Sequence, residues 1–396
     1  MLRDFPAFRA TAAGFFGVAL LSGCTMSQPI YSEIALDDFG DAIKHWEDQQ
    51  RDDEAGHYDA NQIIEIADNI LLYQRANGGW PVNRHPTRKI NEAERAQILA
   101  EKPFLDGSFD NRNTYPQVEY LSWVYLQTGD IRYRQGALDG LRFTLEAQYD
   151  NGGFAHSPYR TEQSYYQHIT FADDIMPGVL GFLRAVALGM HPYGYVPMAL
   201  REQAAEAVAK GNALILELQV RQGDRPTVWA GQYHKDTLEP TTGRPYEVPA
   251  LASWESVAVV EYLMGIEDPP GPVIGAIESA VDWFERVRFD GMALVEEPLR
   301  APVEYRFHVA THDRVLAESP DAGPVWARFY DLDTNKAVFA NRDGFRVPKL
   351  ADVHLERRTG YDWYGRWPEK LVNEDYPQWQ ERVYSPQGGA GHVERY

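Results

Sequence analysis

Residues 71–80, LLYQRANGGW, end one stretch of apolar residues at helical spacing, and a closely related segment, LEAQYDNGGF, occupies residues 145–154. A more divergent third copy, LELQVRQG, lies at residues 216–223. In each copy, the Asn-Gly or Gln-Gly pair favours a left-handed residue that ends the expected helix. The shared glutamines, about 70 residues apart, are Gln74, Gln148 and Gln219. Because two helices and their connections need a period of this length, each repeat predicts a helical hairpin.

Helical hairpins that repeat in this way predict an α/α toroid, a mainly α fold whose loops line a cleft at one end. Strand signals are few, and the alternation of Tyr305, Phe307 and Val309 predicts a strand over residues 305–315. We therefore expect a minor β component in the C-terminal part of the toroid. Chance recurrence of a common helix ending is the alternative explanation of the repeat.

The composition of the 396 residues fits a large folded domain and excludes several protein classes. Hydrophobic residues make up 44% of the chain and aromatic residues 13%, enough for a sizeable core and for surfaces that pack on ring-shaped ligands. A single Cys excludes a disulfide framework and cysteine-ligated zinc or iron–sulfur sites. The net charge of −20, with no long run of Lys or Arg, argues against a nucleic-acid partner.

The N-terminus has the features of an export signal. Arg3 and Arg9 make a basic start, and residues 10–21 form an apolar stretch too short to span a membrane. The segment LSGC at residues 21–24 resembles the lipobox of bacterial lipoproteins, in which the Cys is lipidated. An ordinary signal peptide with a coincidental Cys is the alternative.

These features predict a lipoprotein signal peptide over residues 1–23, lipidation of Cys24 and a polar tether over residues 24–50. The protein is then exported and held at the bacterial cell envelope, with the lipid anchor as its membrane contact. Since Thr25 rather than Asp follows Cys24, we expect the outer membrane.

Two acidic segments precede apolar-periodic runs and are candidates for chemistry. Asp110 or Thr114 could cap the following helix, and so could the pair at residues 173–174. The same carboxylates suit a hard cation such as Ca²⁺. His168 and His234 are candidates for acid–base work, although a His among aromatic residues is more often structural. Serine hydrolase, zincin and P-loop motifs are absent from the sequence.

The C-terminal third places Arg among aromatic residues. Arg328 lies within WARFY at residues 326–330, Arg342 follows, and residues 356–368 read ERRTGYDWYGRWP. Guanidinium forks bind carboxylates, while Tyr and Trp faces pack against pyranose rings. The pattern therefore indicates a carboxylated sugar, with Arg–aromatic packing in an ordinary core as the alternative.

Taken in order, these motifs resemble the pectate lyases of polysaccharide lyase family 10 over roughly residues 60–370. The matching segments are NGGWP at 77–81, Asp110-Asn111 with Thr114 and Gln117, HITFADDIM at 168–176, GRPYEVP at 243–249 with Glu255-Ser256, WARFY at 326–330, RDG at 342–344 and RTGYDWYG at 358–365. Several ordered motifs of this length make the resemblance specific.

The resemblance implies calcium-assisted β-elimination of α-1,4-linked polygalacturonate, which gives 4,5-unsaturated oligogalacturonides. It implies that Asp110 and Asp173 hold Ca²⁺ and that Arg244 takes the proton from C5. It further implies substrate binding by a set of four residues, namely Arg328, Arg342, Asn111 and Tyr246. We place this catalytic domain at residues 51–370, expect a flexible tail at residues 371–396, and expect a monomer.

The chain departs from the family pattern beside both expected calcium ligands. The departures are Arg112-Asn113 in place of Gly-Ala, Pro116 in place of Thr, and Ala172 and Asp174 in place of Asn on either side of Asp173. Arg112 beside the calcium site could serve a carboxylate or compete with the cation.

Other functions remain open from the residues alone. A carbohydrate-binding lipoprotein could keep the fold and capture oligogalacturonate without cleaving it. An α/α-toroid glycoside hydrolase could use paired carboxylates such as Asp173 and Glu255. A lyase acting on another uronate polymer, such as alginate, is a further alternative.

Overall fold

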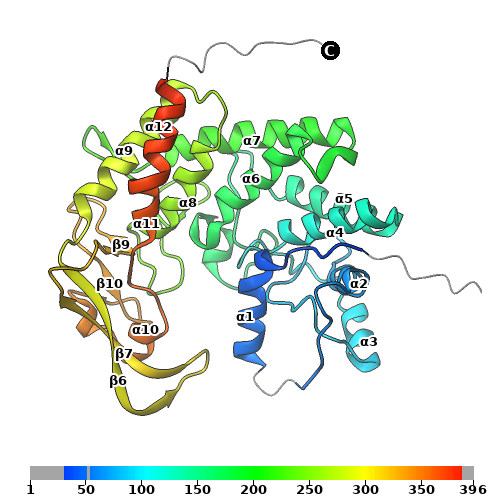
Figure 1. Cartoon of the computed structure of the whole chain (residues 1–396), viewed down its shortest axis with the longest axis horizontal. Coiled ribbons are helices and arrows are strands. Elements are labelled where there is room, and N and C mark those ends of the chain that lie inside the picture. The colour runs from blue at the N-terminus through cyan, green and yellow to red at the C-terminus, as the bar shows by residue number, and fades with distance from the viewer. Residues whose placement is uncertain (1–30, 51–53, 386–396) are drawn as a thin grey trace, which may run out of the picture.

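The structure is a computed structural model that describes residues 31–50 and 54–385 (Figure 1). Helices dominate it. Their bounds are α1 Gly40–Gln49, α2 Ile63–Tyr73, α3 Glu92–Ala100, α4 Tyr115–Thr128, α5 Ile131–Glu146, α6 Ile175–Leu188, α7 Met198–Leu218, α8 Ser253–Met264, α9 Gly271–Val287, α10 Leu355–Thr359, α11 Trp367–Lys370 and α12 Tyr376–Tyr384.

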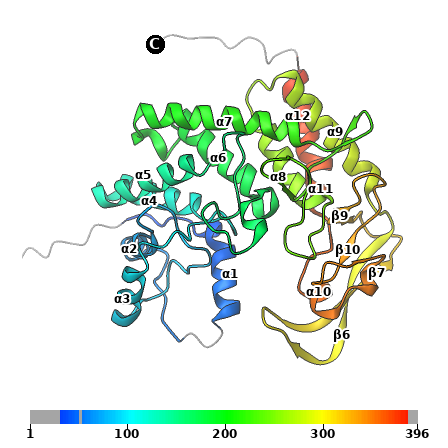
Figure 2. The same ribbon diagram turned by 180° about the vertical axis from the view of Figure 1, so that it is seen from behind.

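The helices from α4 to α9 form hairpins, α4 with α5, α6 with α7 and α8 with α9. Figures 1 and 2 show these hairpins following one another along an arc, with α2 and α3 at one end and α11 and α12 beside α9 at the other. The predicted α/α toroid is therefore confirmed. Among the described residues, no helix has the length and apolar character needed to cross a bilayer.

The repeated glutamines explain why the hairpins stack in this way. In all three copies, the side-chain amide nitrogen donates to a carbonyl in its own turn and to a carbonyl in the second helix of the next hairpin. The acceptors are Gly78 and Gly136 for Gln74, Gly152 and Ala207 for Gln148, and Thr227 and Ala276 for Gln219, all at 2.9 to 3.0 Å. The equivalent bonds show that the third copy is a true member of the repeat.

A fourth copy, which the sequence analysis missed, follows α9. The indole nitrogens of Trp80, Trp229 and Trp326 each donate to a carbonyl in the helix before them, at 2.8, 2.7 and 2.8 Å. Val325-Trp326-Ala327 also repeats Val228-Trp229-Ala230 in sequence. The fourth copy was hidden because the β6–β7 hairpin separates its tryptophan from its helix.

Strands are short apart from this hairpin, and every pair is antiparallel. The pairs are β1 Ile169–Thr170 with β4 Gln232–Tyr233, β2 Arg221–Gln222 with β3 Arg225–Pro226, β5 Leu251–Ala252 with β9 Phe329–Tyr330, β6 Met292–Glu304 with β7 Val309–Glu318, β8 Trp326–Ala327 with β12 Tyr364–Gly365, and β10 Phe339–Ala340 with β11 Arg346–Val347.

The strand predicted over residues 305–315 is only partly correct. Tyr305 and Phe307 lie in the turn between β6 and β7, and only the part from Val309 onward is strand. β6 gave no signal because its residues are exposed or half-buried on both faces, so no apolar alternation marks it.

Two segments expected to lie outside the fold are partly within it. The predicted tether over residues 24–50 is wrong for residues 31–50, because Phe39 is buried against Tyr120 at 6.0 Å and α1 follows it. The predicted flexible tail is wrong for residues 371–385, where Trp379 of α12 is buried. A single aromatic anchor in a polar stretch leaves little periodicity to detect. Residues 24–30 and 386–396 lie outside the described residues.

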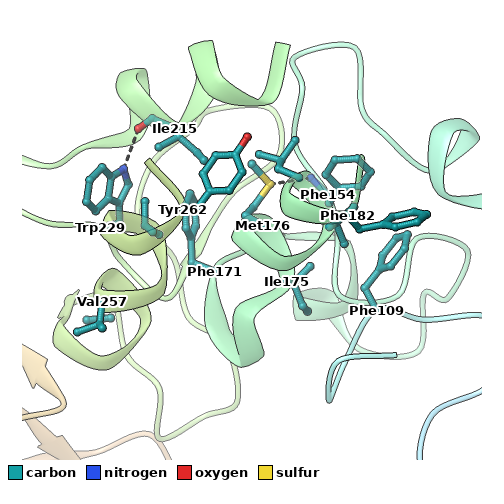
Figure 3. Packing of buried hydrophobic residues seen from close by; sticks show 14 of the residues in the cluster. Phe109, Phe154, Phe171, Ile175, Met176, Phe182, Ile215, Trp229, Val257 and Tyr262 are labelled. Carbon is teal, nitrogen blue, oxygen red and sulfur yellow. Dashed lines mark hydrogen bonds between the residues drawn. The ribbon is translucent and has the colours of Figure 1, made fainter. Parts of the chain in front are cut away.

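The core lies between the hairpins and reaches the loops that carry the acidic candidates (Figure 3). Phe109, directly before Asp110, is fully buried, and so is Phe171, two residues before Asp173. These aromatic anchors hold the loops ahead of α4 and α6 against the hydrophobic core.

The second Asn-Gly-Gly turn provides a stability test. Gly152 has φ +96°, and a Cβ there would lie 2.5 Å from the Lys210 carbonyl oxygen of α7. We expect Gly152→Ala to lower the free energy of unfolding by about 2–3 kcal/mol, measured by urea denaturation. Gly129 also has a positive φ but nothing within 4 Å of its Cβ position, so Gly129→Ala is the control. Equal losses in both variants would contradict the close approach to α7.

Candidate active site

The loops before α4, α6 and α8 lie side by side because of another repeated bond. A backbone NH near each helix start donates to a carbonyl group in the next repeat. That carbonyl belongs to the residue two positions after the aromatic residue that the repeats share. These bonds are Phe109 to His156, Phe171 to Gly231 and Ser253 to Arg328, at 3.1, 2.9 and 2.8 Å. Residues from distant parts of the chain therefore meet at one end of the toroid.

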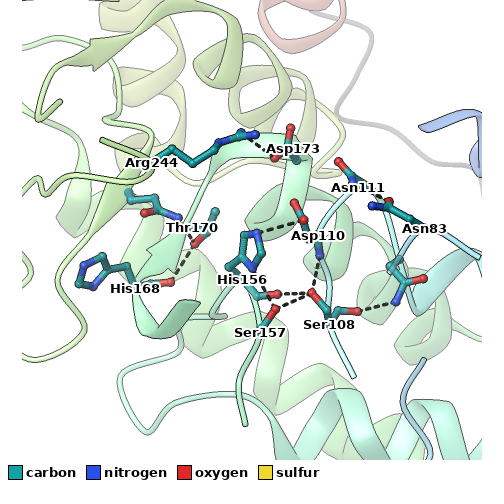
Figure 4. Close-up of polar contacts among 12 residues, drawn as sticks. Asn83, Ser108, Asp110, Asn111, His156, Ser157, His168, Thr170, Asp173 and Arg244 are labelled. Atoms are coloured by element: carbon teal, nitrogen blue, oxygen red, sulfur yellow. Dashed lines mark hydrogen bonds and ion pairs between the residues drawn. The ribbon is translucent and has the colours of Figure 1, made fainter. Parts of the chain in front are cut away.

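Asp110 and Asp173 meet there (Figure 4). They are close enough for each carboxyl group to change the ionisation of the other. The Nε2 atom of His156 lies 3.1 Å from Oδ2 of Asp110. The bond that begins the α4 helix is made instead by Thr114 and Gln117, which form a capping box. Asp110 is therefore free for another role.

The two carboxyl groups ionise differently. For Asp173, desolvation and the charge of Asp110 raise the pKa, in spite of the opposing charge of Arg244. For Asp110, desolvation is outweighed by the charge and hydrogen bond of His156, which keep its pKa well below the usual range. Neighbouring like charges disfavour each other, which is one cause of the raised pKa of Asp173.

The backbone of both loops is in a conformation that L-residues rarely adopt. Asn111 and Arg112 have φ of 53° each, and Asp173 and Asp174 have φ of 53° and 57°. Such left-handed non-glycine residues cost about 1–3 kcal/mol each and gather at functional sites. The left-handed pair thus directly follows Asp110 in one loop and begins at Asp173 in the other.

The donor set fits a hard cation that a ligand must help to bind. Asn111, whose amide nitrogen donates to Asn83 at 2.8 Å, lies beside the two aspartates and retains its amide oxygen (Figure 4). Within residues 31–50 and 54–385, no group of three or more His, Cys, Asp and Glu side chains could hold a metal ion. Two carboxylates and an amide oxygen leave most calcium positions to water or substrate oxygens.

Arg244 faces the aspartates from the loop after β4. Its Nη2 atom lies 3.6 Å from Oδ2 of Asp173 and 2.9 Å from Oε1 of Glu247. Glu247 also accepts the backbone NH of Arg244 at 2.8 Å, which fixes the loop. Desolvation works against the charged guanidinium, but the carboxylates prevail and hold the pKa of Arg244 well above its ordinary value.

Arg328 is buried and does not extend into solvent. Its Nε and Nη2 atoms donate to Oε1 of Glu255 at 2.8 and 2.5 Å. The guanidinium carbon lies 4.4 Å from the ring centre of Trp254 and 4.5 Å from that of Tyr361. The Arg–aromatic packing considered as the alternative from sequence therefore describes this residue, since its side chain is 6% exposed.

Arg342 is an exposed member of the Arg–aromatic group, with 45% of its side chain accessible. It shares the carboxylate of Glu356 with Arg357, in four contacts of 2.8 to 3.0 Å. Burial raises the pKa of Glu356, but the hydrogen bonds of both arginines prevail and lower it to about 2. Tyr246 is buried beneath the two guanidinium groups and supports them, instead of presenting its ring to a ligand.

The remaining sequence candidates lie apart from this group. The ring centres of His168 and His234 lie 5.6 Å apart, and within the described part of the chain no hydrogen bond or ion pair joins either ring to Arg244 or the two aspartates. Desolvation and the neighbouring His234 lower the pKa of His168.

Sequence reasoning missed His156, Glu247 and Glu356 as members of the site. His156 had a detectable signal, because it stands two residues after the aromatic position of the second repeat, as Arg328 does in the fourth. Glu247 stands within the GRPYEVP segment, three residues after Arg244. Glu356 had no such signal, because its role depends on a contact with a distant loop.

Comparison with known proteins identifies the family. A profile described as pectic acid lyase matches residues 74–372. The chain belongs to this family.

Solved structures of family 10 polysaccharide lyase from Cellvibrio cellulosa resemble this pectic acid lyase family member. One, a mutant in complex with trigalacturonic acid, shares 26% sequence identity at a TM-score of 0.66 and covers 88% of this chain and 99% of that chain. Another, of the same lyase, also has 26% identity and a TM-score of 0.66, with coverages of 87% and 98%. No curated protein matches the sequence. The chain is thus a polysaccharide lyase of the pectate lyase type.

Proposed function

We propose that this pectate lyase cleaves α-1,4-linked polygalacturonate by calcium-assisted β-elimination. The observation that carries the proposal is the meeting of Asp110, Asp173 and Arg244 from three separate segments, with Arg244 3.6 Å from Asp173. The complex of the Cellvibrio lyase with trigalacturonic acid supports oligogalacturonate as ligand. Unsaturated oligogalacturonides are the expected products.

In the proposed reaction, the C5–H bond breaks as Arg244 takes the proton. The electron pair forms the C4–C5 double bond, and the C4–O bond breaks with its pair on the glycosidic oxygen, which takes up a proton. Asp110 and Asp173 would hold Ca²⁺, which when bound would neutralise the substrate carboxylate and stabilise charge that develops next to it. Exposed Arg342 would bind a neighbouring carboxylate of the polymer.

The surroundings of Arg244 set a condition on this role. While Asp173 and Glu247 both face the guanidinium, it holds its proton strongly. A base at this position needs that negative charge to be neutralised, and Asp173 is also the carboxylate proposed to bind the cation. Alkaline solution favours the same proton loss.

The hydrolase alternative has little support from the site. It needs Asp173 and Glu255 as a pair of carboxyl groups on either side of a glycosidic bond. Glu255 is 3% exposed and bound to Arg328, so it cannot approach such a bond. A binding protein without catalysis remains as the competing function.

Removal of the metal tests the proposed reaction. With polygalacturonate at alkaline pH, we expect ultraviolet absorbance to rise with Ca²⁺ and to stop rising with excess EDTA, because elimination creates a conjugated double bond. Readdition of Ca²⁺ should restore the rise, and this controls for damage by the chelator. New reducing ends without absorbance would indicate hydrolysis, and neither signal would favour a binding protein or another uronate polymer.

We also propose that the protein is exported and anchored at the bacterial envelope through lipidated Cys24, a position outside the described residues. Cys24→Ser should move the protein from the detergent-soluble membrane fraction to the aqueous fraction, because the Cys carries the only proposed anchor. Fractionation followed by immunoblotting measures this. Membrane retention of the Cys24→Ser protein would contradict lipidation.

A further inference from the structure

The two loops that carry Asp110 and Asp173 are joined by an ion pair. Arg112, two residues after Asp110, places Nη2 at 2.5 Å and Nε at 3.2 Å from Oδ2 of Asp174. Asp174 directly follows Asp173. The contact thus links the start of α4 to the start of α6 across 62 residues of chain.

The pair lies where like charges and an unfavourable backbone conformation both oppose the observed arrangement of the two loops. Asp110 and Asp173 are like-charged neighbours, so each disfavours the approach of the other. Arg112 and Asp174 are also themselves in the left-handed backbone conformation, which the surrounding contacts must maintain. A cross-link at these residues opposes both tendencies.

Arg112 points to this partner rather than to the metal site. The Nη2 and Nε atoms of Arg112 both face Oδ2 of Asp174. Within residues 31–50 and 54–385, no hydrogen bond or ion pair joins Arg112 to Asp110 or Asp173. Arg112 therefore does not occupy the position of a cation between the two aspartates.

From this geometry we propose that the Arg112–Asp174 pair holds the two carboxylate-bearing loops at the separation that a divalent cation needs. Both are positioning residues, and neither is a metal ligand. The proposal rests on the calcium-dependent function proposed above and adds a device built from two positions at which this chain departs from the family pattern.

The test is calorimetric titration of Ca²⁺ with trigalacturonate present, in an Arg244→Lys background so that the sugar is not consumed. We expect Arg112→Gln and Asp174→Asn each to weaken calcium binding by about three- to tenfold, since a partly exposed ion pair contributes on the order of 1 kcal/mol. The charge-reversed double variant, Arg112→Asp with Asp174→Arg, should recover most of the affinity.

Arg112→Gln decides between this proposal and simpler electrostatics. If only long-range charge matters, removing a positive charge beside a cation site tightens cation binding. The same result follows if Asp174 is itself a metal ligand for which Arg112 and the cation compete. Holding the loops together predicts the opposite sign. Tighter or unchanged calcium binding by Arg112→Gln would overturn the proposal.

A matched control removes an ion pair of similar exposure elsewhere. Arg142 and Asp139, 2.7 Å apart on α5, have side chains 44% and 42% exposed, so Arg142→Gln should leave calcium affinity unchanged. Circular dichroism and thermal melting of each variant check folding. If the Arg244→Lys protein with Arg112 and Asp174 intact binds no calcium, the proposed role of calcium fails, and this proposal fails with it. If both single variants bind calcium with the same affinity as the parent, only this proposal is overturned.

Discussion

Arg244→Lys is expected to lower the rate of elimination from polygalacturonate by about 10³-fold, in the range that loss of a general base produces. Lys keeps a positive charge but lacks the planar guanidinium, whose Nη2 atom now lies 3.6 Å from Asp173 and 2.9 Å from Glu247. The initial rate of ultraviolet absorbance increase at saturating Ca²⁺ measures the change. Binding of polygalacturonate, followed by affinity electrophoresis, should persist.

The two readouts together separate the functions considered for this chain. A wild-type protein that binds the polymer without cleaving it would be the non-catalytic binding protein. An Arg244→Lys protein that cleaves at the wild-type rate would show that the base is elsewhere. Arg142→Lys, on the surface of α5, is the matched control and should change neither measurement.

Glu255→Gln is expected to lower the free energy of unfolding by about 3–5 kcal/mol, because it leaves the charge of Arg328 buried without its partner. Arg328 sits between Trp254 and Tyr361 and donates twice to one oxygen of Glu255. Urea denaturation measures the loss.

A double variant tests the cause of that loss. Glu255→Gln with Arg328→Met removes the unpaired charge, so it should recover much of the stability. Asp139→Asn, which breaks an exposed pair on α5, should cost less than about 1 kcal/mol and is the surface control. A loss from Glu255→Gln as small as the control would show that Arg328 reaches water or another partner.

Much of the fold could be predicted because its signals are local and repeated. Gln74, Gln148 and Gln219 each mark a helix end, and each makes the same two hydrogen bonds in the structure. The β6–β7 hairpin and helix α1 were not predicted correctly. Neither has an apolar face of sufficient length, and both are held by contacts with distant segments.

The candidate site was predictable in part for a different reason. Asp110, Asp173 and Arg244 stand in segments that resemble a known family, and the structure brings them together. Resemblance did not show that Tyr246 is buried under two guanidinium groups or that Arg328 is paired with Glu255. Those outcomes depend on which side chains meet across the toroid.

The sequence by itself determined the repeat, the α/α toroid and the family, and the resemblance to that family supplied the candidates proposed for calcium binding and proton abstraction. Side-chain type, spacing and order contain that information, because helix ends and turns follow from neighbouring residues. Only the tertiary structure decided the partners from other segments: His156 for Asp110, Asp173 for Arg244, Glu356 for Arg342 and Asp174 for Arg112. Charge and pKa depend on distances between residues far apart in the chain, and those distances exist only after the hairpins have packed.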